Sequence, residues 1–135
     1  MKEGLRKLFL TTNAIKSIVG NRIYITRVPQ GADKDKEHIL ITQLSSDENK
    51  TLDGTSELRF LDIDIDCKSP TSAKSDTLAI AVRGFLDDYT GSAGDQTIGA
   101  VLFNGESDSF ESPADASDKG LYVTTLDFQI QYNPA

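Results

Sequence analysis

Three aspartates, Asp62, Asp64 and Asp66, occupy every second position of the stretch FLDIDIDCKS. Carboxylates at this spacing could hold a cation or carry out acid–base chemistry. A calcium-binding loop of the EF-hand type also begins with Asp at alternate positions, but it needs Gly at its sixth position and Glu at its twelfth. Counting from Asp62, these positions hold Cys67 and Ala73. The three aspartates therefore do not form a calcium loop of this type.

An active site built from two of these carboxylates is a separate hypothesis. Alternate residues of a strand lie about 6.6–7 Å apart, so neighbouring aspartates could flank a water or a cation, whereas Asp62 and Asp66, about 13 Å apart, could not converge. Catalysis would also need a histidine, a lysine or another acid from a second strand, and no motif provides one. The simplest interpretation is a strand whose aspartates face solvent while Ile63, Ile65 and Cys67 point inward. A weak cation site and an acidic metal-dependent enzyme that uses the aspartates are the alternatives, and a melting temperature that shifts with divalent cations would favour the enzyme.

Other residues with distinctive chemistry are few. Cys67 is the single cysteine and His38 the single histidine. This excludes an internal disulfide, a cysteine-based zinc site and histidine-pair metal motifs, and it argues against a Ser–His–Asp triad.

The net charge is −7, and all of the excess negative charge lies in the second half of the chain. Residues 1–68 hold 11 basic and 11 acidic side chains, whereas residues 69–135 hold 3 basic and 10 acidic side chains. Without a basic stripe, tight binding of DNA or RNA is disfavoured. No run approaches the roughly 20 apolar residues of a membrane span, and residues 1–20 do not have the pattern of a secretory signal.

Hydrophobic periodicity predicts the elements that must position the aspartates. Residues 1–20 predict a helix, with a break near residues 11–13 where Asn13 could cap a second short helix that ends at Gly20. Strands are predicted at 21–31, 38–44 and 60–69, followed by a helix at 69–89 that Ser69 could cap. Residues 97–111 predict a strand that runs into a polar stretch, and residues 121–133 predict the last strand. We therefore expect one domain over residues 1–135 of the α+β class, in the order α-β-β-β-α-β-β. Its mainly antiparallel sheet should have four to five strands, with two main helices packed on one face.

The Asp53-Gly54 pair predicts a hairpin turn between the strands at 38–44 and 60–69, because both residues tolerate the positive φ angles of a tight turn. With the turn at these two residues, the numbers of paired residues sum to 107. The predicted pairs are then Leu44 with Ile63, Leu40 with Cys67, and Gln43 with Asp64.

The same register places Leu58 and Phe60 on the aspartate side of the hairpin. The tip then either carries a bulge or extends beyond the core. A projecting arm with apolar residues indicates contact with another subunit. The candidate contact residues are Lys50, Thr51, Leu52, Asp53, Gly54, Leu58 and Phe60.

Several short motifs occur along the chain in an order that is typical of one family. They are VG-x-RIY after the first helix, I-D-C before the second main helix, and D-F-x-I in the last strand. Here they are Val19, Gly20, Arg22, Ile23 and Tyr24; Ile65, Asp66 and Cys67; and Asp127, Phe128 and Ile130. Through this ordered set, over nearly its whole length, the chain resembles the tail completion, or tail terminator, family of long-tailed bacteriophages. The acidic segment SDSFESPADASDKG departs from the family pattern.

The resemblance implies a structural protein of the virion, without catalysis and without a cofactor. Such proteins form a ring, usually sixfold, on the head-proximal end of the tail tube, stop its growth and join it to the filled head. The implied partners are further copies of the chain, the tail tube protein and a head-completion or connector protein. DNA would pass through without specific binding, no membrane would be involved, and assembly would take place in the bacterial cytoplasm.

In such a ring, Asp62, Asp64 and Asp66 would form a candidate acidic face toward the lumen or the solvent. Six chains would carry a formal charge of 6 × −7 = −42, so the free protein is expected to be largely monomeric. Another neck connector or minor tail protein would share this pattern of elements. A small ligand-binding module would need an aromatic pocket, but the chain has no Trp, and core stripes account for most of its four Tyr and six Phe.

Overall fold

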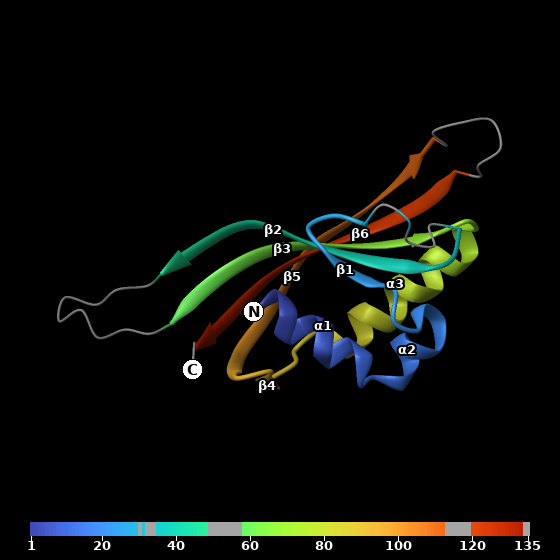
Figure 1. Cartoon of the computed structure of the whole chain (residues 1–135). Coiled ribbons are helices and arrows are strands. Elements are labelled where there is room, and N and C mark those ends of the chain that lie inside the picture. Colours follow the sequence, from blue (N-terminus) through green and yellow to red (C-terminus); the bar gives the residue numbers. More distant parts are fainter. Residues whose placement is uncertain (30, 32–34, 49–57, 113–119, 134–135) are drawn as a thin grey trace.

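The computed structural model describes residues 1–29, 31, 35–48, 58–112 and 120–133. Within these residues the chain forms, in order, α1 (Lys2–Leu10), α2 (Asn13–Val19), β1 (Ile23–Ile25), β2 (His38–Glu48), β3 (Arg59–Ser69), α3 (Ser72–Leu86), β4 (Gly91–Ala93), β5 (Gln96–Glu111) and β6 (Leu121–Asn133) (Figure 1). None of the helices in this part of the chain is long and apolar enough to cross a membrane.

A single sheet joins the six strands in the order β1-β2-β3-β6-β5-β4. The four long strands β2, β3, β6 and β5 are antiparallel to their neighbours, β4 is antiparallel to β5, and β1 is parallel to β2. All three helices lie on the same side of this curled sheet (Figure 1). Within the described residues, the sheet therefore has one face covered by helices and one face without a helix.

The predicted sheet of four to five mainly antiparallel strands with two main helices is wrong in its details. In the described residues the sheet has six strands and one parallel pair. The strand β4 falls between the predicted helix at 69–89 and the predicted strand at 97–111, where no element was predicted, because three residues are too few to show hydrophobic alternation. The parallel pairing of β1 needs a long crossover connection, and residues 26–37 are long enough to provide it.

The N-terminal helix is divided into two, so three helices are present in the described residues instead of two main ones. At the break, the hydroxyls of Thr11 and Thr12 both donate to the carbonyl oxygen of Leu8, at 2.8 and 3.0 Å. Thr12 is the N-cap residue of α2 and Asn13 is the first residue of the helix, so the predicted cap at Asn13 is wrong by one position. The predicted end of this helix at Gly20 is confirmed, and Gly20 has a φ of 59° there.

The register of the β2–β3 hairpin differs from the predicted one by one residue near the core. Paired residue numbers sum to 106 from His38–Lys68 to Gln43–Ile63, and to 107 from Ser45–Asp62 outward. A bulge at Leu44 causes the change, because it inserts one unpaired residue into β2.

The predicted pairs are therefore wrong, and the bulge lies within β2, whereas the expected one was at the hairpin tip, which lies outside the described residues. The observed arrangement places Leu40 opposite Asp66 and Gln43 opposite Ile63, and leaves Leu44 54% exposed. A one-residue slip moves every side chain to the other face of a strand. Consequently Ile39 and Ile41, instead of Leu40 and Leu44, enter the core.

The core lies between the sheet and the helices. Ile63, Ile65 and Cys67 of β3 are fully buried, as predicted. The buried residues around them include Leu126, Phe128 and Ile130 of β6 and Leu78, Val82 and Leu86 of α3. Burial of each large aliphatic or aromatic side chain contributes about 1.5–3 kcal/mol, so this cluster fixes α3 against the centre of the sheet.

The start of α3 is fixed by two short polar contacts. Thr71 is the N-cap, and its hydroxyl accepts the backbone N–H of Lys74 at 3.3 Å. Ser69, which the sequence proposed as the cap, instead accepts the backbone N–H of Thr71 at 3.1 Å. The hydroxyl of Ser75 then donates to the carbonyl oxygen of Cys67 at 2.8 Å and so ties the first turn of α3 to β3.

Candidate functional site

The aspartates of β3 lie on the face of the sheet that no helix covers. Their side chains are half-buried and alternate with the fully buried side chains that face the helices. Thus the alternation expected from the sequence is present. The residues opposite Asp62, Asp64 and Asp66 on β6 are Gln129, Asp127 and Thr125. With Asp127 added, four carboxylates lie on two neighbouring strands of this face, which we call the acidic face.

Two of the aspartates on β3 are hydrogen-bonded to neighbouring strands. Asp62 Oδ2 accepts the hydroxyl of Ser45 on β2 at 2.8 Å. Asp66 Oδ1 accepts the hydroxyl of Thr125 on β6 at 2.7 Å. These bonds hold both side chains against the sheet and satisfy part of their acceptor capacity.

Asp64 is in a less favourable position because it stands directly opposite Asp127. Partial burial raises the pKa of Asp64, and the charges of Asp127 and Asp66 raise it further. Like charges directly opposite each other on adjacent strands are destabilising. No described side chain offers either Asp64 or Asp127 a hydrogen bond or an ion pair. The centre of the acidic face is therefore a repulsive pair without a basic partner inside the described chain.

The arrangement offers little for metal binding or acid–base catalysis. Among the described residues, no group of three or more His, Cys, Asp or Glu side chains is placed to hold a metal ion. Cys67 is buried on the opposite face of the sheet, and burial raises the pKa of its thiol. His38 is also buried; its pKa is lowered by that burial, although a contact between Nδ1 and the Lys36 carbonyl oxygen at 2.9 Å acts in the other direction. The carboxylates of the acidic face, the thiol of Cys67 and the imidazole of His38 therefore do not form one site.

The β2–β3 hairpin forms an arm that extends beyond the helices at one end of the sheet (Figure 1). Of its candidate contact residues, Lys50, Thr51, Leu52, Asp53 and Gly54 lie outside the described residues. Leu58 and Phe60 are half-buried, and Phe60 is opposite Gln131 on the same face as the aspartates. Their role in a subunit contact stays a prediction.

A second arm, formed by β5 and β6, extends at the opposite end of the sheet (Figure 1). Sequence reasoning missed its exposed aromatic pair, Phe110 and Tyr122, whose rings lie 5.0 Å apart and are 52% and 42% exposed. An ion pair between Lys68 Nζ and Glu111 Oε1 at 2.7 Å joins β3 to this arm. The signal in the sequence was Phe110, a large apolar residue isolated in a polar stretch.

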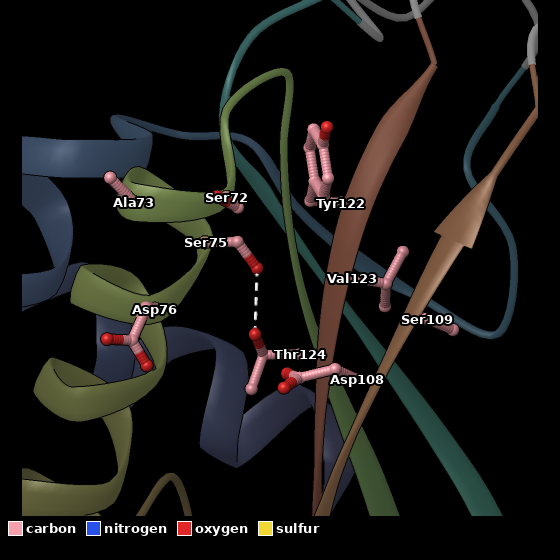
Figure 2. Close-up of a pocket in the computed structure, with 9 residues that line it drawn as sticks. All are labelled: Ser72, Ala73, Ser75, Asp76, Asp108, Ser109, Tyr122, Val123 and Thr124. Atoms are coloured by element: carbon pink, nitrogen blue, oxygen red, sulfur yellow. Dashed lines mark hydrogen bonds between the residues drawn. The ribbon is translucent and has the colours of Figure 1, made fainter.

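A hollow of about 350 Å³ lies between the second arm and the first turns of α3. Figure 2 shows Asp76 of α3 and Asp108 of β5 beside it, and the hydrogen bond between the hydroxyls of Ser75 and Thr124 at 2.9 Å. Its lining residues are Ser72, Ala73, Ser75, Asp76, Asp108, Ser109, Tyr122, Val123 and Thr124. The Ser75 hydroxyl is already engaged with Cys67 and Thr124. None of the described residues that line the hollow is a histidine or a lysine, which are common bases for an activated serine.

Comparison with known proteins identifies a family and a similar fold. Residues 3–133 match the family described as tail completion protein gp17. The fold is similar to that of a chain in the solved structure "Virion of native gene transfer agent (GTA) particle", with a TM-score of 0.62, 14% sequence identity, and coverage of 95% of this chain and 91% of that one. No curated protein matches the sequence significantly. Because the family match covers nearly the whole length, the chain belongs to the tail completion protein gp17 family and is a structural protein of a phage-type virion tail.

Proposed function

We propose that the chain forms a ring on the head-proximal end of the tail tube, ends the growth of the tube and joins the tail to the head. It acts by assembly and not by catalysis. Its partners are further copies of itself, the tail tube protein and a head-completion or connector protein. Membership of the tail completion family supports this role.

The acidic face is the observation that carries the proposal. A ring between tube and head must let DNA pass through its lumen without retaining it. Phosphates bind proteins mainly through basic side chains that displace counterions. The helix-free face presents Asp62, Asp64, Asp66 and Asp127, so DNA beside it would release no counterions and would not be held.

A ring with the helices turned toward the lumen would be less suitable as a DNA channel. Lys7 of α1 and Lys16 of α2 are exposed on the helical side of the molecule. Turned toward a lumen, six copies of each would attract the phosphate backbone. The proposed ring therefore has the acidic face inside and the helices outside.

Deletion of the gene from its phage tests the role in joining. The deletion lysate should contain filled heads and separate tails by electron microscopy, and added purified protein should join them and restore the plaque titre. Joined particles and a normal titre in the deletion lysate would refute the proposal.

A charge reversal tests the orientation of the ring. In D62K/D64K/D66K, tails should still join heads but eject DNA more slowly, because the lumen would now attract phosphates. The variant D76K/D87K/D95K makes the same charge change at exposed positions away from this face and should eject normally. Equal ejection rates for the two variants would contradict an acidic lumen.

A further inference from the structure

The second arm carries an exposed aromatic pair that lies outside the core. Phe110 of β5 and Tyr122 of β6 are directly opposite each other, and their rings meet edge to face while both stay largely exposed. A Cβ at Gly120 would overlap the ring of Phe110, so the glycine leaves the space in which this ring lies. The aromatic pair is therefore held in a fixed position without being buried.

The hollow beside this pair is acidic. Asp108 lies two residues before Phe110 on β5 and so shares its face of the strand, and Asp76 comes from α3 (Figure 2). Both carboxylates are exposed. Tyr122 also lines the hollow, so the aromatic pair and the two carboxylates are continuous. We call Asp76, Asp108, Phe110 and Tyr122 the arm surface.

The nearby lysines of the described chain are paired elsewhere. Lys74 Nζ lies 3.4 Å from Glu37 Oε1, and Lys68 Nζ lies 2.7 Å from Glu111 Oε1. Among the described residues, the carboxylates of Asp76 and Asp108 form neither an ion pair nor a hydrogen bond with any side chain. The arm surface thus has an excess of negative charge that a basic group from another protein would offset.

An arginine side chain suits this combination of groups best. Its planar guanidinium can donate two parallel hydrogen bonds to one carboxylate, and it stacks on aromatic rings, which a lysine ammonium does less well. The volume of about 350 Å³ is at the lower end of the range for binding sites. Arginine and aromatic residues are also enriched where proteins meet. The arm surface therefore has the chemistry of a contact for an arginine-bearing segment.

The position of the second arm indicates which partner would supply the arginine. With the acidic face toward the lumen, the sheet lies in the wall of the proposed ring, and the two arms extend from its opposite ends toward the two rims (Figure 1). One rim meets the tube and the other meets the head. Joining a head to a tail brings together two large preassembled particles, and attraction between opposite charges can raise such encounter rates by about 10–10³. An acidic arm therefore suits the rim that meets the head.

We propose that the arm surface docks an arginine-bearing segment of the head-side connector protein. The inference rests on the proposed function and names the surface and the partner chemistry through which the ring meets the head. Asp76 and Asp108 speed the encounter, because charges at the rim of an interface act mainly on the association rate. Phe110 and Tyr122 hold the arginine and its aliphatic stem in the joined particle, because aromatic contacts of this kind act mainly on dissociation.

The rate at which isolated tails join purified filled heads, followed by plaque titre, tests the role of the carboxylates. Tails with D76N/D108N should join at least about tenfold more slowly at low salt, and the difference should disappear at high salt. The control D87N/D95N removes the same charge at exposed positions outside the arm surface and should join at the natural rate. Particles of either variant that have joined should eject DNA normally. Equal joining rates for the two variants would overturn the proposal.

Replacing the ring of Phe110 tests the second step separately. Tails with F110A should join at nearly the natural rate, because no charge is lost, but joined particles should release their tails at least about tenfold faster after dilution. Tails of natural length show that the variant folds and assembles. Release at the natural rate would contradict a contact at the aromatic pair.

Chemical modification of the heads tests the identity of the partner. Phenylglyoxal, which modifies arginine, should slow the joining of treated heads to natural tails but have little further effect with D76N/D108N tails, because the same contact is already lost. Equal slowing with both kinds of tail would exclude an arginine at this contact. Irregular tube lengths in D76N/D108N tails would place the arm surface at the tube and overturn the choice of partner.

Failure of the proposed function would give a different result. Heads that join tails lacking the chain would refute the proposed function and the docking of the arm surface with it. Normal joining by D76N/D108N tails, together with no joining by tails that lack the chain, would refute only the arm surface.

Discussion

Neutralising Asp64 should stabilise the folded chain, which is the reverse of the usual effect of a substitution in a sheet. Asp64 stands opposite Asp127 and has Asp66 on the same face. Two unit charges about 5 Å apart repel by about 0.8 kcal/mol in water and about 3 kcal/mol at an effective dielectric constant of 20. Since these side chains are partly exposed and screened, a gain of about 0.5–1 kcal/mol is expected, in the range of measured cross-strand pairs.

The assay is urea unfolding of the natural chain, D64N, D127N and D64N/D127N at pH 7 and low salt. D64N should raise the free energy of unfolding by the stated amount, which corresponds to a rise in Tm of about 2–4 °C for a domain of this size. The double variant should gain less than the sum of the single gains, because either substitution alone removes the same repulsion. D62N is the matched control, since Asp62 lies on the same strand but accepts a hydrogen bond from Ser45.

The pH dependence has a definite sign. A raised pKa for Asp64 means that the folded state binds its proton more tightly than the unfolded state does. The penalty of the charged form is therefore fully present at neutral pH and disappears as the pH falls through the folded-state pKa. The advantage of D64N should shrink over the same range and also with added salt. A D64N variant that is no more stable than the natural chain, or whose gain is insensitive to salt and pH, would refute the repulsive pair.

Three further predictions concern assembly and packing. Light scattering should show mainly monomer at low ionic strength, with association rising as salt screens the net charge of −7; stable hexamers at low salt would contradict this. Replacing residues 50–55 by a short turn should leave the monomer Tm unchanged but weaken complementation, and wild-type complementation would exclude a contact at the tip. Ser75→Ala should cost about 1–3 kcal/mol in urea unfolding, because buried groups of Cys67 and Thr124 lose their partner, whereas Thr77→Ala, which removes an exposed bond within α3, should cost much less.

The second arm shows why part of the surface could not be predicted. The strand β5 continues to Glu111, through a segment that the sequence indicated only as polar. Hydrophobic alternation marks a strand when one of its faces enters a core, but residues 106–111 are exposed on both faces. Their strand structure comes from pairing with β6, and a pairing between distant segments leaves no local pattern.

The sequence by itself determined which side chains share a face of β3. The side-chain period of a strand is two, so Ile63 and Ile65 had to point away from the aspartates whatever lay beside them. The same holds for α3, whose apolar stripe at helical spacing had to pack against the sheet. The order of short motifs along the chain was likewise sufficient to indicate the family that the comparison then confirmed.

Only the tertiary structure decided what lies next to these residues. The bulge at Leu44 shifted the register of β2, because one extra residue changes which partners meet without altering the local hydrophobic pattern. Likewise, Asp127 became the neighbour of Asp64 through a pairing of strands more than sixty residues apart. The identity of each strand's neighbour, and with it the acidic face, follows from how the strands are ordered in the sheet. That order depends on long-range contacts, whereas a strand's own residues determine only its two faces.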